Sequence, residues 1–139
     1  MKNIEFECVV QNLRRASRLV SRRYERALKP VNLTSSQFTI FQSLAGRAGL
    51  PHGLMAEILG FEQTTLTRLL KPLEKRGLVL IEPNPKDRRE KIVKQTKQGE
   101  ELFKEAKRLW RVEQNKSLGE LDDAEWVAMK AALKRLSDI

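Results

Sequence analysis

The chain has 139 residues, of which 40% are hydrophobic, so its length and composition favour one domain with a modest core. It carries 27 Lys and Arg against 18 Asp and Glu, and the net charge of +9 favours a polyphosphate or an anionic membrane surface as partner over an acidic protein. The single cysteine, Cys8, excludes an internal disulfide, and no apolar run approaches the roughly 20 residues of a membrane-spanning helix.

The first predicted element is a long amphipathic helix. Apolar residues recur every three or four positions from Val9 to Val31, and Pro30 stops the helix. The arginines that lie off this apolar stripe are Arg14, Arg15, Arg18, Arg22 and Arg26. At about 1.5 Å per residue the helix would run roughly 40 Å. It would carry more apolar surface than a small central body can cover, which favours a second subunit.

The rest of the chain divides into short elements followed by longer helices. Thr34 and Gln37 form a capping box for a helix that ends at Gly46, and glycine and proline mark residues 49–53 as a loop. Pro72 should bend the helix that contains it without breaking it. The elements expected after the loop are helices over 54–59 and 63–76, strands over 78–81 and 91–95 with a turn at 84–87, and helices capped by Thr96 and by Asp122 with Glu125. We therefore expect a mainly α fold with a small β hairpin.

The two short helices have the spacing of a helix-turn-helix. A small Ala56 lets the helices approach, Gly60 permits a tight turn, and Leu66 and Leu69 pack the second helix on the first. The outward face of the second helix carries side chains that bind base edges or phosphates, with no acid among them. These candidate DNA-binding residues are Gln63, Thr64, Thr65, Thr67, Arg68 and Lys71. Taken alone, the spacing also fits plain packing of two helices.

The hairpin that follows carries more charge than a turn needs, which indicates an anionic partner. A recognition helix followed by a basic two-stranded ribbon is the order of parts in a winged helix, whose ribbon arginine can reach the minor groove. Asp87 can fix the direction of one arginine through a two-pronged hydrogen-bonded pair. The candidate wing residues are Lys86, Asp87, Arg88, Arg89 and Lys91. The alternative is a solvated turn whose charges prevent aggregation of an exposed hairpin.

These features together resemble the MarR family of bacterial winged helix-turn-helix transcription regulators over nearly the whole chain. The segments that carry the resemblance are residues 13–38 for the first helix and the entry to the second, 62–79 for the recognition helix, and Asp87-Arg88-Arg89 with Thr96 and Gly99 for the wing and the turn behind it. Gln95 departs from the leucine that the family usually carries before this threonine, which puts no functional residue in doubt.

The resemblance implies a single domain that functions as a homodimer. Residues 1–33 and 97–139 would be the dimerisation helices, and residues 34–96 would be the winged helix-turn-helix DNA-binding region. By analogy with the family, Arg89 would enter the minor groove with Asp87 as its support. The protein would then be a transcription regulator that binds pseudo-palindromic double-stranded DNA and is released by a small-molecule effector. We expect it to be a repressor.

Single residues and motifs raise other possible functions for this chain. A redox-sensing regulator acting through Cys8 and an RNA-binding module are the alternatives, although A-form RNA closes its major groove to a helix. His52, the only histidine, lies in the expected loop, where a ligand-binding or proton-sensing role is the less favoured interpretation. The sequence has no phosphate-binding glycine loop and no metal-ligand spacing, so we expect no enzyme, no cofactor and no metal site. With no secretion signal at the start, we expect a cytoplasmic protein without a membrane partner.

Overall fold

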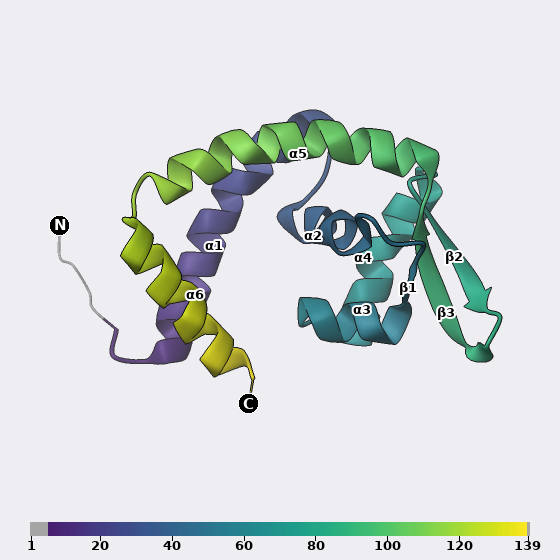
Figure 1. Cartoon of the computed structure of the whole chain (residues 1–139), viewed down its shortest axis with the longest axis horizontal. Helices are drawn as coiled ribbons and strands as arrows, with labels where there is room; N and C mark the ends of the chain where they lie inside the picture. Colours follow the sequence, from purple (N-terminus) through teal and green to yellow (C-terminus); the bar gives the residue numbers. More distant parts are fainter. Residues whose placement is uncertain (1–5, 139) are drawn as a thin grey trace.

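The structure, a computed structural model, describes residues 6–138 as a mainly helical chain with one three-stranded antiparallel sheet (Figure 1). The elements in chain order are α1 (Val9–Leu28), a 3-10 turn (Lys29–Val31), α2 (Ser35–Leu44), β1 (Leu50–Pro51), α3 (His52–Leu59), α4 (Gln63–Lys75), β2 (Val79–Asn84), β3 (Asp87–Gln95), α5 (Lys97–Leu118) and α6 (Asp123–Ser137). The predicted winged helix-turn-helix fold is confirmed, with α3 and α4 as the helix pair and β2 and β3 as the wing.

Local sequence sets the ends of several helices. Thr34 Oγ1 accepts a hydrogen bond from the Gln37 backbone N–H at 3.1 Å, and the Gln37 side chain accepts one from the Thr34 N–H at 3.1 Å. Asp122 and Glu125 form the same reciprocal box at the start of α6. Both boxes satisfy backbone N–H groups that the first helical turn leaves without a partner. α2 ends two residues before the predicted Gly46, which instead follows the helix at a φ of +71°.

α2 lies at the centre of the core, with α5 on one side and α3 and α4 on the other (Figure 1). The Phe38 ring of α2 stacks on Trp110 with 5.6 Å between ring centroids and lies 5.5 Å from Phe103. Trp110 therefore belongs to the core of the subunit. The other large buried side chains are Phe41, Leu28, Ile40, Leu44, Met55, Leu66, Leu70, Leu73, Val79 and Val93.

β3 is the central strand of the sheet, with β1 on one side and β2 on the other. The predicted loop over residues 49–53 is wrong, because β1 begins at Leu50 and α3 begins at His52. A glycine is needed at the start of β1, since a Cβ on Gly49 would lie 2.8 Å from Ile92 Cγ2. This pairing across the sheet fixes the first turn of α3 against the wing.

α4 continues through Pro72 to Lys75 without a break, as predicted. Gly77 then adopts a left-handed φ of +72°, and the Leu78 N–H donates to the Leu73 carbonyl at 3.0 Å. This is the Schellman ending that glycine favours after a helix, and it turns the chain directly into the wing.

The first turn of α5 packs against the root of the wing. The Thr96 hydroxyl donates to the Gly77 carbonyl at 2.7 Å, and its backbone N–H donates to the Leu78 carbonyl at 3.1 Å. Gly99 is the close-packed residue here, because a Cβ at this position would clash with the Leu78 carbonyl oxygen. α5 is thereby joined rigidly to β2 and β3.

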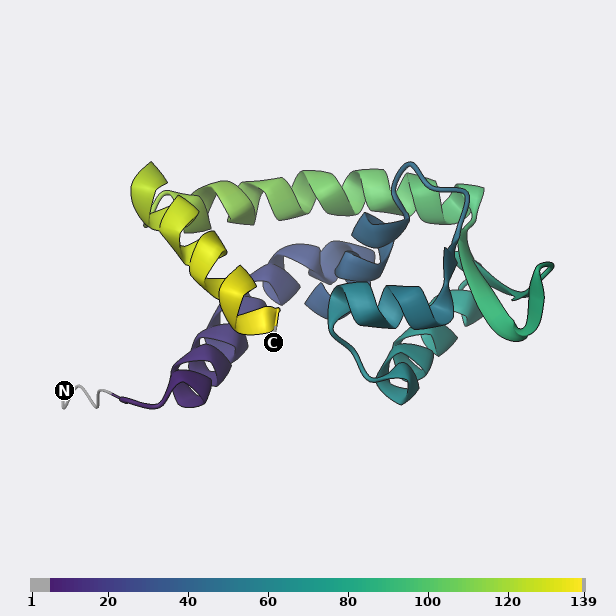
Figure 2. The same cartoon turned by 60° about the horizontal axis from the view of Figure 1, so that its bottom comes forward.

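α1 and α6 lie at the end of the molecule opposite the wing, and α5 connects the two ends (Figures 1 and 2). Within the described chain, α6 has no buried residue and α1 has only Leu28. The Trp126 side chain of α6 is half-buried, with Lys130 Nζ 5.1 Å from its ring centroid. The exposed large apolar residues of these helices are Val9, Val10, Leu13, Leu19, Val20, Val127, Met129, Leu133 and Leu136. Among the helices of residues 6–138, none combines the length and apolarity needed to cross a membrane.

Candidate nucleic-acid interface

The turn between α3 and α4 has the geometry that the sequence spacing predicted. Gly60 adopts a φ of +72°, and the Phe61 N–H donates to the Ala56 carbonyl at 2.9 Å. Ala56 is 2% exposed, so the helices approach closely at this small side chain. Leu66 is buried and Leu69 is partly buried against the core, and α4 therefore presents its opposite face to solvent.

The solvent-facing side of α4 has no carboxylate between its first residue and Lys71. Five of the six predicted residues are exposed there, namely Gln63, Thr64, Thr67, Arg68 and Lys71. Thr65 differs because it is half-buried, and its hydroxyl accepts a hydrogen bond from Arg68 Nη2 at 3.4 Å. Thr65 is thus placed to orient Arg68 and is less accessible than the other five.

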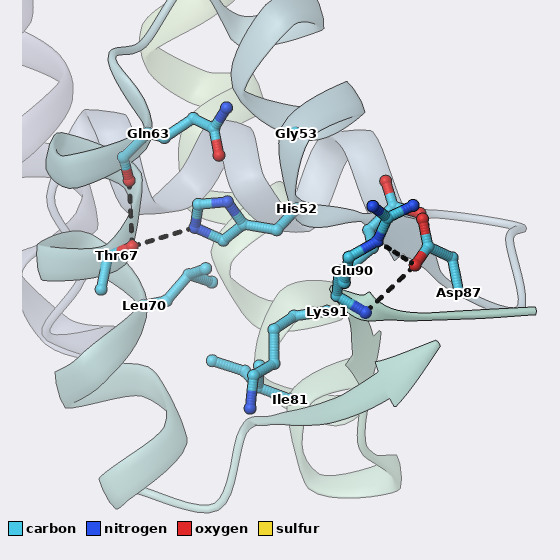
Figure 3. Close-up of a pocket in the computed structure, with 10 residues that line it drawn as sticks. His52, Gly53, Gln63, Thr67, Leu70, Ile81, Asp87, Glu90 and Lys91 are labelled. Carbon is cyan, nitrogen blue, oxygen red and sulfur yellow. Dashed lines mark hydrogen bonds and ion pairs between the residues drawn. The ribbon is translucent and has the colours of Figure 1, made fainter. Parts of the chain in front are cut away.

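A residue that the sequence analysis placed in a loop contacts this face. His52, at the first position of α3, lies with Nε2 3.0 Å from Thr67 Oγ1 (Figure 3). The Thr67 hydroxyl in turn donates to the Gln63 carbonyl at 2.9 Å. No local sequence signal links positions 15 apart in different helices, so this contact appears only once α3 and α4 are packed.

The wing is longer than predicted, and its turn is reduced to Pro85 and Lys86. The Lys86 N–H donates to Asn84 Oδ1 at 3.0 Å, which closes the turn from within. Lys86 and Arg88 are both exposed. Arg88 and Arg89 consequently belong to the first residues of β3, next to the turn and not within it.

The strand pairing of the wing is interrupted next to the turn. Asn84 pairs with Asp87, and the next pair is Pro83 with Lys91, so residues 88–90 have no partner on β2. Pro83 has no backbone N–H to donate to a ladder hydrogen bond, which accounts for the interruption at this position. Bulges of this kind redirect the side chains of the bulged strand, and here two of the three residues are arginines.

Hydrogen bonds fix the orientation of the bulged residues. Asp87 Oδ1 accepts from the Arg89 backbone N–H at 3.1 Å and lies 3.3 Å from Arg89 Nε. Asn84 Nδ2 donates to Glu90 Oε2 at 3.0 Å on the other side of the bulge. The Arg89 side chain remains 93% exposed, so its direction is set while its guanidinium faces solvent.

A hollow of about 510 Å³ separates α3 and α4 from the wing (Figure 3). Its lining combines predicted residues of both elements with His52. The lining residues are His52, Gly53, Gln63, Thr67, Leu70, Ile81, Asp87, Arg89, Glu90 and Lys91. The fold thus brings two candidate residues of α4 and three of the wing to one concave surface, namely Gln63, Thr67, Asp87, Arg89 and Lys91. The other candidates, Thr64, Thr65, Arg68, Lys71, Lys86 and Arg88, do not line it.

Cys8 lies apart from this surface. It immediately precedes α1 and is exposed. Tyr24, the only tyrosine, donates its hydroxyl to Gln114 of α5 at 2.6 Å. The redox interpretation of Cys8 stays a prediction.

Comparison with known proteins identifies the family. The sequence model of the MarR family matches residues 33–91, a segment that contains every candidate residue of α4 and the wing. The transcriptional regulator MOSR of M. tuberculosis, solved in complex with DNA, is 30% identical, with 95% of each chain covered and a TM-score of 0.86. The chain belongs to the MarR family. It is therefore a winged helix-turn-helix member of a family of transcription regulators.

Two further solved structures resemble this MarR-family chain over nearly its full length. One is BpsR of Bordetella bronchiseptica, whose DNA binding is regulated by 6-hydroxynicotinic acid; it is 25% identical, with 99% of each chain covered and a TM-score of 0.86. The other is the transcriptional repressor CouR of Rhodococcus jostii RHA1 bound to a 23-mer DNA duplex, 25% identical, covering 98% of this chain and 99% of that one with a TM-score of 0.84.

Proposed function

We propose that this MarR-family protein is a homodimeric repressor that binds pseudo-palindromic double-stranded DNA and is released by a small-molecule effector. The observation that carries the proposal is the acid-free, exposed face of α4 beside a wing whose Arg89 is oriented by Asp87. An α-helix of this kind fits the major groove, and an arginine at the ribbon can enter the minor groove.

The residues divide by the part of the duplex that they would contact. The exposed polar residues of α4 would contact base edges and phosphates in the major groove, with Thr65 holding Arg68 in place. Arg89 would enter the minor groove. The remaining wing cations would neutralise flanking phosphates, and they are Lys86, Arg88 and Lys91.

The apolar faces of α1 and α6 support the dimer. Residues 1–33 and 97–139 would form the dimerisation helices and residues 34–96 the DNA-binding region of the single domain. A helix without a buried residue, as α6 is here, gains stability only when another surface covers it. A two-fold partner supplies such a surface and would place the two copies of α4 about 34 Å apart, one turn of duplex.

Release by an effector requires that the effector bind one spacing of the two α4 helices better than the other. The similarity to BpsR and CouR supports a regulator of this kind. The DNA binding of BpsR is regulated by a small molecule, and CouR is a transcriptional repressor. We expect the protein to act in the cytoplasm on promoter DNA. The bound dimer would block polymerase there.

Selection of duplexes from random DNA tests the proposal. The purified protein should enrich a pseudo-palindrome with half-sites about 10 base pairs apart, centre to centre. Its affinity should fall with salt, with a log–log slope of about −0.9 per phosphate neutralised, and duplex DNA should compete far better than RNA. A monomer in light scattering, or no duplex binding at low salt, would refute it.

A further inference from the structure

The hydroxyl of Thr67 is already engaged inside the protein. A threonine hydroxyl has one proton to donate and two lone pairs. Thr67 Oγ1 donates that proton to the Gln63 carbonyl at 2.9 Å, and a carbonyl oxygen can only accept. Toward His52 Nε2, 3.0 Å away, Thr67 must therefore accept. It follows that His52 Nε2 carries a proton, which fixes the direction of both hydrogen bonds.

These two hydrogen bonds also determine which part of Thr67 faces solvent. Bonding to the carbonyl four residues earlier selects the χ1 angle of a helical threonine, and the contact with His52 holds the same oxygen from a second side. Figure 3 shows the Thr67 oxygen turned toward Gln63 and His52, with the methyl carbon pointing away from them. Thr67 as a whole is exposed, so α4 presents a methyl group at this position.

Thr64 gives the contrasting case on the same face of α4. It is exposed, and its side chain makes no hydrogen bond within residues 6–138. Its hydroxyl is free to donate or accept at a base edge or a phosphate. The two threonines are therefore chemically different at the surface, although the sequence lists them as equivalent candidates.

We propose that Thr67 contacts the C5-methyl group of a thymine through its own methyl group, and that His52 is the positioning residue that keeps this methyl group outward. Thymine is the only base that presents a methyl group in the major groove, so such a contact discriminates among base pairs without a hydrogen bond. The inference rests on the proposed function and assigns a base preference to one residue of that surface.

Deoxyuridine substitution tests the contact directly. Each thymine of the duplex selected by the wild-type protein is replaced in turn by deoxyuridine, which lacks only the methyl group. A replacement in one half-site alone should weaken wild-type binding by about fourfold, the factor expected for burying one methyl group. The thymine-to-uracil ratio is the affinity for the thymine duplex divided by the affinity for the uracil duplex. Thr67→Ser should bring this ratio to one, whereas Thr67→Val should bind more weakly than wild type and keep the ratio. Thr39→Ser is the matched control, since Thr39 also donates to a backbone carbonyl, that of Ser36 at 2.7 Å, but lies in α2.

The outcomes separate this inference from the proposed function. Binding of duplex DNA with a ratio of one at every thymine, or equal ratios in Thr67→Ser and wild type, would overturn the methyl contact and leave the repressor proposal standing. Binding of no duplex at all would overturn both. For His52, the ratio should fall in His52→Ala and recover in part in His52→Gln, which restores an N–H donor; an unchanged ratio in His52→Ala would remove its positioning role.

The direction of the hydrogen bond can be measured without DNA. Because His52 is the only histidine in the chain, its imidazole nitrogen signals need no assignment by mutation. Nitrogen NMR of the free protein should find the neutral ring protonated at Nε2. A neutral ring protonated at Nδ1 alone would contradict the geometry on which the inference depends.

Discussion

The pair formed by Asp87 and Arg89 gives the sharpest test of the wing. Arg89→Ala removes the proposed minor-groove contact of each subunit, and the loss of one specific arginine contact should weaken operator binding by about 1–3 kcal/mol per subunit, roughly 5- to 150-fold for each. Asp87→Ala leaves that arginine in place but frees its side chain, which is 93% exposed. Ordering one long side chain on binding costs about 0.5–1.5 kcal/mol, so Asp87→Ala should cost roughly two- to tenfold in affinity per subunit.

A double-mutant cycle separates the orientation of Arg89 by Asp87 from a general effect of charge on DNA binding. If Asp87 acts by orienting Arg89, its replacement should cost nothing further once Arg89 is alanine, and the coupling energy should equal the whole Asp87→Ala effect. Arg88→Ala is the matched control, because it removes the same charge from an exposed neighbour with no carboxylate partner among residues 6–138. Asp87→Ala should still weaken binding in the Arg88→Ala protein.

Fluorescence anisotropy on the selected duplex at one fixed salt concentration measures the cycle, and thermal unfolding checks the fold. An exposed ion pair contributes about 0–1 kcal/mol to stability, so Tm should change by no more than a few degrees in every variant. Additive losses for Asp87→Ala and Arg89→Ala would refute the orienting role. Tighter binding by Asp87→Ala would show that removing its negative charge outweighs any effect on Arg89.

Three further predictions address the rest of the molecule. Gly99→Ala should lower the unfolding free energy by at least about 1–3 kcal/mol in chemical denaturation, because its Cβ would clash with the Leu78 carbonyl; an unchanged midpoint would show that α5 can shift there. Leu133→Glu on the exposed face of α6 should give a monomer in light scattering, whereas Lys130→Ala should stay dimeric; a dimeric Leu133→Glu would place the interface elsewhere. Lys71→Ala should weaken binding about equally for all duplexes and reduce the salt slope by about 1 per subunit, and a loss confined to one sequence would assign it to base contact instead.

The features predicted correctly from sequence are those that local chemistry decides. The capping boxes at Thr34 and Asp122 involve residues three positions apart. The sequence pattern alone therefore predicts their hydrogen bonds. The helix-turn-helix could be predicted from the small side chain of Ala56 and from Gly60. Glycine adopts the left-handed backbone conformation of this turn without steric cost, so no distant contact is needed to form it. The candidate residues of α4 and the wing follow from their polar and basic side chains, and the family resemblance adds the dimer and the roles of Arg89 and Asp87.

The features that were missed depend on contacts distant in sequence. His52 was assigned to a loop because glycine and proline surround it, and only pairing of β1 with β3 makes it the first residue of α3. Its contact with Thr67 joins two helices and leaves no periodic trace. The interrupted pairing in the wing has a signal in the sequence, because Pro83 lacks the N–H that a regular ladder needs, but the predicted turn over residues 84–87 does not include Pro83.

The fusion of α5 to the wing root has a mechanical consequence. A continuous helix of 22 residues is about 33 Å long, and its first turn is locked to β2 while its far end lies beside α1 and α6. Over this length, a rotation of α5 by about 10° at its far end displaces the wing by roughly 6 Å, comparable to two base-pair steps along a duplex. In the proposed dimer, a small angular change between the two subunits would therefore shift each wing relative to its groove.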